Sequence, residues 1–71
     1  MIEITVGQCL LKSILKMRKM SQQQLADCTG LSKQEINSYA NDRRRMSLKT
    51  SKLIAVTLKL TIDDLYEWKI K

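Results

Sequence analysis

Residues 21–41, SQQQLADCTGLSKQEINSYAN, contain two helix starts of the same design. In each start a serine is followed three residues later by a glutamine or a glutamate: Ser21 with Gln24, and Ser32 with Glu35. Such a capping box satisfies free amides of the first turn, because the hydroxyl and the longer side chain each accept a backbone hydrogen bond. Gly30 stands between the two starts, where a helix must end and a positive φ is tolerated. The spacing predicts two short helices joined by a tight turn.

This pair of helices has the composition of a helix-turn-helix unit. Four apolar residues supply its internal contacts: Leu25, Ala26, Leu31 and Ile36. The small Ala26 allows the two helices to cross closely. In such a unit the second helix enters the major groove of DNA. We therefore take residues 33–40 as a candidate recognition helix.

Residues 21–36, SQQQLADCTGLSKQEI, resemble the core signature of the Cro/cI-type, lambda-repressor-like helix-turn-helix family. The flanks fit as well, since GQCLLKSILKMRKM is similar to the first helix of the family and SKLIAVTLKLTIDDLY to its last two. The resemblance covers residues 7–66 and implies an all-α fold of five helices, with room for short extended termini. We expect one domain over residues 1–71, with helices at 8–19, 22–29, 33–40 and 48–58 and a fifth that starts at Thr61.

Composition and charge point to an acidic partner. The chain has 71 residues, a net charge of +6 and an isoelectric point near 9.6. Residues 12–52 hold ten lysines and arginines against three acids, a local net charge of +7. Nucleic acid, an anionic membrane or an acidic protein would fit this charge. So small a core leaves little room for a catalytic pocket, and we expect no enzyme activity.

Cysteine and histidine usage argues against metal or cofactor chemistry. The chain has no histidine and only two cysteines, Cys9 and Cys28, without a CxxC motif, so we expect no metal site and no cofactor. Both cysteines fall in expected helices, and we interpret them as buried thiols of a reducing cytosol. No signal peptide or membrane-length apolar run is present in the sequence. We therefore predict a cytoplasmic protein of a bacterium or a phage-infected cell.

The outward side of the candidate recognition helix carries polar residues suited to base edges. They are Lys33, Gln34, Asn37 and Ser38. Glutamine and asparagine can bond adenine in pairs, and lysine can donate to guanine. The resemblance implies base reading at these positions. It also implies a phosphate contact for Gln22 in the first turn of the preceding helix. Ser32 is a cap that can also touch phosphate.

Three arginines follow the candidate recognition helix directly. Arg43, Arg44 and Arg45 stand where relatives touch the DNA backbone, and we expect phosphate or minor-groove contact there. The turn before them has Asn41 and Asp42 in place of the glycine that many relatives use, and asparagine tolerates the left-handed conformation. Relatives also carry an ion pair where this chain has Leu15 and Ala40. We expect an apolar contact to replace it at little net cost in stability.

Apolar residues are more numerous than one small core requires. The surplus residues are candidates for a homodimer interface: Leu53, Val56, Leu60, Trp68 and Ile70. Trp68 could instead cover the N-terminal strand of its own subunit. Residues 1–6 alternate as a strand does, and so do residues 67–71. The two termini could pair with each other or with a second subunit, or the N-terminus could be disordered.

These observations predict sequence-specific binding of double-stranded DNA by a small transcriptional regulator of the phage or mobile-element type, acting as a repressor. Its partners would be an operator and a second copy of the chain. A regulatory protein partner is also conceivable. The alternative function is a protein-interaction module on the same fold, for example an antirepressor. Apolar or acidic residues at the four candidate base-reading positions would favour that alternative, and this chain has polar and basic residues there.

Overall fold

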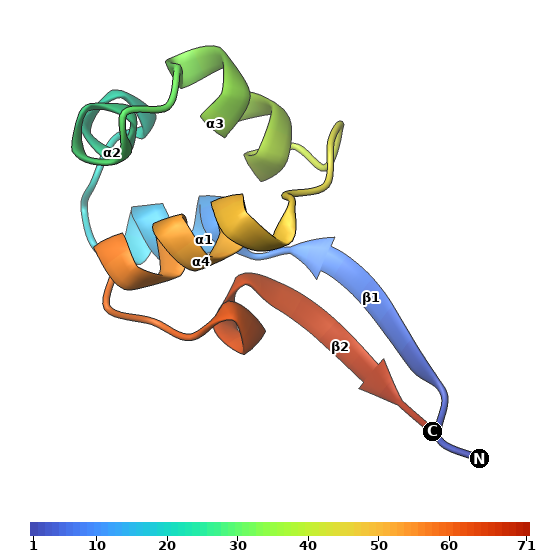
Figure 1. Cartoon of the computed structure of the whole chain (residues 1–71). Coiled ribbons are helices and arrows are strands. Elements are labelled where there is room, and N and C mark those ends of the chain that lie inside the picture. Colours follow the sequence, from blue (N-terminus) through green and yellow to red (C-terminus); the bar gives the residue numbers. More distant parts are fainter.

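The computed structural model describes residues 1–71 and consists of four α-helices and a two-stranded antiparallel sheet (Figure 1). The elements follow one another as β1 (Ile4–Cys9), α1 (Leu11–Met17), α2 (Gln22–Thr29), α3 (Lys33–Ala40), α4 (Leu48–Thr57), the 3-10 helix η1 (Ile62–Leu65) and β2 (Tyr66–Ile70). The prediction of an all-α fold with five helices is therefore wrong. The helix-turn-helix pair nevertheless has the predicted bounds in both of its helices.

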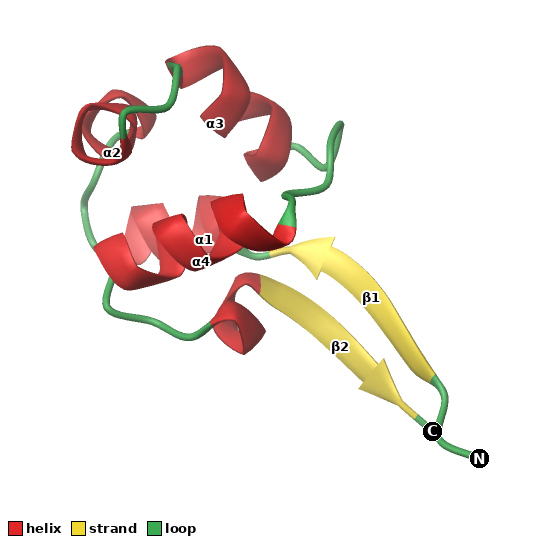
Figure 2. Cartoon of the chain, viewed as in Figure 1, coloured by secondary structure: helices red, strands yellow, loops and turns green.

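The fifth helix of the prediction is a single turn of 3-10 helix (Figure 2). Its start has the expected acids, and the Thr61 amide and hydroxyl both donate to Asp64 Oδ2 at 3.0 Å. These hydrogen bonds hold the pKa of the Asp64 carboxyl below its usual range, and the one from the Thr61 backbone amide has the larger effect. The helix ends after four residues because Tyr66 adopts an extended backbone and enters β2. Pairing with β1 thus replaces further helical turns.

The two termini pair with each other, which is one of the three alternatives that the sequence left open. Ile4 lies opposite Ile70, and Val6 lies opposite Trp68. Opposite residues of an antiparallel pair share a face, so these four apolar side chains lie on one side of the hairpin. Figure 1 shows the hairpin projecting from the helices with both termini at its tip, in a molecule that measures 41 × 21 × 19 Å.

Residues 8 and 9 belong to β1, so the predicted start of the first helix at Gln8 is wrong. Two tertiary hydrogen bonds hold this segment: the Cys9 amide donates to Asp42 Oδ1 at 2.9 Å, and the Leu10 amide donates to the Leu65 carbonyl at 2.8 Å. The strand register shifts between Val6 and Cys9. A Cβ on Gly7 would lie 3.1 Å from both the Cβ and the carbonyl oxygen of Glu67, so the close approach of the strands favours glycine.

One apolar core joins all four helices to the base of the hairpin. Its fully buried side chains are Leu11, Leu25, Ile36, Ile54, Leu58 and Leu65. Leu15 and Ala40 are also buried members of it. None of the helices has the length and apolar character that a membrane crossing requires.

Candidate nucleic-acid interface

The turn between α2 and α3 has the conformation that the sequence predicts. Both bonds of the first capping box form: the Gln24 amide donates to Ser21 Oγ at 3.0 Å, and the Ser21 amide donates to Gln24 Oε1 at 2.8 Å. Gly30 ends α2 with a φ of 78°, in the left-handed region. Helix α3 can therefore leave α2 within a few residues and cross it.

The second capping box forms only in part. The Glu35 amide donates to Ser32 Oγ at 3.1 Å, as predicted, but the Glu35 carboxylate accepts from the Ser32 hydroxyl at 3.3 Å instead of from the Ser32 amide. The amide of Ser32 thus stays without a side-chain partner at the start of α3. Free amides at a helix N-terminus suit a phosphate group.

Helix α3 presents the four residues that are predicted to read bases, which we call the readers, on the side away from the core. Ile36, Tyr39 and Ala40 are buried, which fixes the rotation of the helix. Lys33 and Gln34 are exposed, while Asn37 and Ser38 are half-buried. Residues four apart are neighbours on a helix surface, so these readers form two adjacent rows, Lys33 with Asn37 and Gln34 with Ser38. Figure 1 shows α3 at the end of the molecule opposite the hairpin tip.

The left-handed residue after α3 is Asp42, with a φ of 58°, and not Asn41, whose φ is −98°. The Asp42 amide donates to the Tyr39 carbonyl at 3.2 Å, and the Arg43 amide donates to the Ser38 carbonyl at 3.0 Å. These two bonds form the usual left-handed helix end. The turn is therefore built as predicted but one residue later, where Asp42 Oδ1 can also accept the Cys9 amide.

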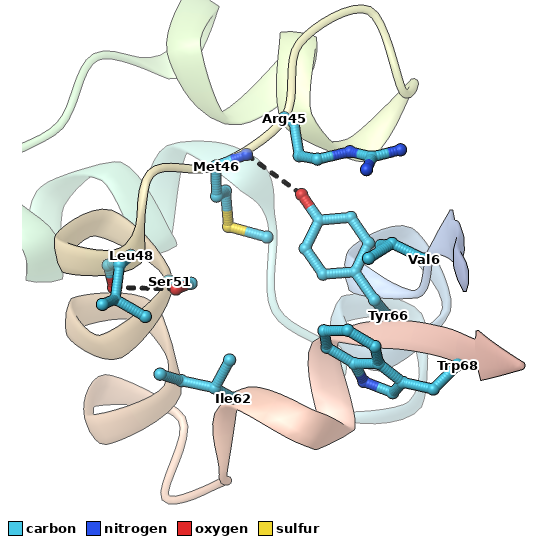
Figure 3. Close-up of a pocket in the computed structure, with 8 residues that line it drawn as sticks. All are labelled: Val6, Arg45, Met46, Leu48, Ser51, Ile62, Tyr66 and Trp68. Carbon is cyan, nitrogen blue, oxygen red and sulfur yellow. Dashed lines mark hydrogen bonds between the residues drawn. The ribbon is translucent and has the colours of Figure 1, made fainter. Parts of the chain in front are cut away.

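We call residues 43–45 the arginine loop. All three side chains are exposed, and the loop projects beside the end of α3 (Figure 1). The next residue, Met46, is buried, and its amide donates to the Tyr66 hydroxyl at 3.0 Å (Figure 3). The loop is thus fixed at Asp42 on one side and at Met46 on the other. The structure brings the arginine loop beside the end of α3, but the Arg45 side chain lines the pocket over Tyr66 together with Val6 and Trp68 (Figure 3).

Changing Tyr66 to phenylalanine should lower the free energy of unfolding by about 1–3 kcal/mol, because the buried Met46 amide loses its acceptor. Burial also raises the pKa of the Tyr66 phenol. A raised folded-state pKa favours the neutral phenol, so this stability is present below about pH 10 and is lost as the pH rises further. Urea titrations of both proteins at neutral pH and above pH 10 would measure the two effects.

Tyr39 offers the matched control for that change. It is buried like Tyr66, but its hydroxyl makes no hydrogen bond within the chain and reaches solvent. Tyr39→Phe should therefore leave stability nearly unchanged. Equal losses for the two variants would contradict the role assigned to the Tyr66 hydroxyl.

The cysteines do not match the prediction of two buried helical thiols. Cys9 is buried, but it lies in β1, where burial raises the pKa of its thiol. Cys28 lies on α2 and is exposed. The chain contains no group of three or more histidine, cysteine or acidic side chains that could hold a metal ion.

The candidate dimer residues do not share one environment. Leu60 is half-buried and packs against the core, whereas Leu53, Val56 and Ile70 are exposed. Trp68 lies opposite Val6 in the hairpin, and its indole N–H donates to the Asp63 carbonyl at 3.0 Å. It also meets Tyr66 edge to face at 6.4 Å, yet it remains 37% exposed (Figure 3).

Comparison with known proteins supports the family that the sequence resembles. The helix-turn-helix family pattern matches residues 11–65. The chain belongs to the Cro/cI-type helix-turn-helix family. The matched region runs from the start of α1 to the end of η1, so both strands of the hairpin lie outside it.

Two relatives come from a prophage of Bacillus subtilis strain 168. The SPbeta prophage-derived uncharacterized HTH-type transcriptional regulator YopS is 33% identical over 72 residues, which cover 100% of this chain and 97% of the relative. The SPbeta prophage-derived uncharacterized HTH-type transcriptional regulator YotL is 34% identical over 62 residues, which cover 86% of this chain and 78% of the relative. The first of these matches includes the hairpin.

Two structural features of the interface were missing from the sequence-based prediction. One is the Tyr66 hydroxyl that fixes the end of the arginine loop, and the other is a hydrogen bond between Gln22 and Asn37. Both join residues that are at least 15 positions apart in sequence. No local sequence signal points to either bond, since each depends on how separate elements pack.

Proposed function

We propose that this protein is a repressor that binds an operator in double-stranded DNA through α3. The coarser class, a DNA-binding transcriptional regulator of the phage type, follows from the family match and from the names of both relatives. The observation that carries the finer proposal is the outward side of α3, where polar side chains stand free of the core beside three exposed arginines. A DNA partner implies a cytoplasmic location in a bacterial or phage-infected cell.

The proposed contacts divide into two kinds. Lys33, Gln34, Asn37 and Ser38 would meet base edges in the major groove, because amides and ammonium groups match the donors and acceptors of adenine and guanine. Gln22, Ser32 and the arginine loop would meet phosphates on either side. Phosphate contacts set the position of the helix, and base contacts set the sequence preference.

Substitutions in α3 and in the arginine loop should separate these two kinds of contact. Gln34→Ala or Asn37→Ala should each cost about 1–3 kcal/mol on the best site and relax the base preference at one position. Arg44→Ala, the matched phosphate variant, should weaken the binding of every sequence alike. Fluorescence titrations with the selected site and with random duplexes would measure both effects. If Gln34→Ala weakened both duplexes equally, the assignment of Gln34 as a reader would fail.

We also propose that two subunits bind together on a palindromic operator. One helix-turn-helix contacts only a few base pairs, and paired half-sites about one helical turn apart supply the missing specificity. The candidate contacts are the exposed apolar side chains of Leu53 and Val56 on α4 and of Trp68 and Ile70 on the hairpin. A weak homodimer that forms mainly on DNA would suit so small a surface.

Val56→Asp should reduce binding to a full palindrome to the level of a single half-site. The side chain is 61% exposed, so the change should leave folding nearly intact. Met17→Asp is the control, since Met17 is also exposed but lies on α1, outside the proposed interface. Sedimentation with half-site and palindromic duplexes would measure the stoichiometry. Strict one-to-one binding of the unaltered protein on the palindrome would rule out the pairing.

A further inference from the structure

The hairpin holds the arginine loop at both of its ends. Directly before the loop, Asp42 Oδ1 accepts the amide of Cys9, the last residue of β1, at 2.9 Å. Directly after the loop, the Met46 amide donates to the hydroxyl of Tyr66, the first residue of β2, at 3.0 Å. Cys9 and Tyr66 lie opposite each other in the sheet. Both anchors of the loop therefore belong to one cross-strand pair at the base of the hairpin.

An irregularity of β1 precedes this pair directly. Between the pair Val6–Trp68 and the pair Cys9–Tyr66, β1 advances by three residues and β2 by two. The extra residue makes a β-bulge, which bends its strand and changes the direction of the groups beside it. The bulge and the anchor of the arginine loop thus fall at the same place in the hairpin.

The arginine loop has few hydrogen bonds of its own. The Arg43 amide donates to a carbonyl of α3 at 3.0 Å, but the amides of Arg44 and Arg45 make no backbone hydrogen bond. The path of the loop beyond Arg43 therefore depends on the anchor at Met46. The bond from Met46 to Tyr66 is buried, and a buried amide that loses its acceptor is costly, so this anchor is a firm one (Figure 3).

We propose that the hairpin holds the arginine loop in position for phosphate contact, with Tyr66 and Asp42 as the positioning residues. The inference rests on the proposed function, since the phosphate contacts of the loop belong to it. A loop that is fixed before binding loses less conformational entropy on DNA than a free loop does. Both strands of the hairpin lie outside residues 11–65, so the family match does not supply this role.

Two changes remove one anchor each and leave every arginine in place. Tyr66→Phe removes the acceptor of the Met46 amide and keeps the ring. Asp42→Gly removes the acceptor of the Cys9 amide, and its reference is Asp42→Asn, which removes the same charge but keeps a side-chain oxygen. Glycine and asparagine both tolerate the left-handed φ of 58° at this position. Tyr39→Phe is the control for the loss of a buried tyrosine's hydroxyl, and thermal melts would show which variants fold.

The readout is the affinity for a selected duplex and for random duplexes, measured with the native loop and with Arg43 and Arg44 changed to glutamine. Arg45 stays unchanged because its side chain lines the pocket over Tyr66. With the native loop, Tyr66→Phe should weaken both duplexes about fivefold, and Asp42→Gly should bind both about threefold more weakly than Asp42→Asn. In the glutamine background each loss should shrink to about twofold or less, because no guanidinium group remains there to be positioned. A purely structural role would give the same loss in both backgrounds.

Equal losses in both backgrounds, or no loss of affinity in the folded variant, would overturn the positioning role. A loss confined to the selected duplex would also overturn it, because phosphate contacts carry no sequence information. Tyr66→Phe decides the test, and the Asp42 pair decides it if Tyr66→Phe does not fold. Failure of the proposed function looks different: the unaltered protein would show no preference for a selected duplex, or the change of Arg43 and Arg44 would leave its affinity as it was. The inference would then fall with the function.

Discussion

Changing Arg43, Arg44 and Arg45 together to glutamine is expected to lower the affinity for any duplex about 100-fold at physiological salt. Each phosphate contact adds about 0.9 to the dependence of log affinity on log salt concentration, and three contacts would be lost. The unaltered protein should show a slope of about −4 to −5 per subunit, for roughly five phosphates. The variant should show a slope of about −1 to −2 on cognate and random duplexes alike.

Binding isotherms at several salt concentrations would measure these slopes. The matched control changes three exposed basic residues of the α1 segment to glutamine: Lys12, Lys16 and Arg18. It removes the same charge from segments outside the proposed interface and should alter the slope much less. A slope that falls equally in both variants would show that net charge, and not the arginine loop, controls binding. A slope near zero for the unaltered protein would remove DNA as its main partner.

Ile36→Ala is expected to produce the largest loss of stability among the changes considered, about 2–5 kcal/mol. The side chain is fully buried on the inner side of α3, directly before the reader Asn37. A domain of 71 residues has a total stability of roughly 4–10 kcal/mol. The melting temperature should therefore fall by about 10 °C or more.

Circular dichroism melts would measure this change, with Leu48→Ala as the control. Leu48 is also a large apolar residue on a helix, but it is 78% exposed, so its truncation should be nearly neutral. Equal losses for both variants would contradict the rotation assigned to α3. The readers could then not all face outward.

The helix-turn-helix pair was predictable because its signals are local. Ser21, Gly30 and Ser32 act within one turn of their own positions, and the structure confirms the bounds of both helices.

The structure of the two chain ends was harder to predict, because each end forms its strand by pairing with the other end. Alternation predicts strands at residues 1–6 and 67–71, but residues 8–9 and Tyr66 lie outside those patterns and are extended where β1 and β2 pair. The same limit applies to the turn after α3. Asp42 adopts the left-handed conformation in a position where it also bonds Cys9, 33 residues away in the sequence.

The candidate site likewise has one part that could be predicted from the local sequence and one part that could not. Helical periodicity was sufficient to place the readers on the outer side of α3, and their contacts with DNA stay a prediction. It could not show that Asn37 bonds Gln22 or that Tyr66 holds the end of the arginine loop, since both contacts depend on how separate elements pack. The proposed specificity therefore needs the tertiary structure as well as the recognition helix.

The central claim is that α3 recognises a particular duplex sequence. The most direct measurement selects bound sites from random duplexes and then compares the affinity for the winning site with that for a scrambled duplex, at about 150 mM salt. We predict a preference of about 1,000-fold or more, in the usual range of specific binding, with half-sites about one helical turn apart. Equal affinities for the selected and scrambled duplexes would contradict the claim and favour a protein-interaction role for the same fold.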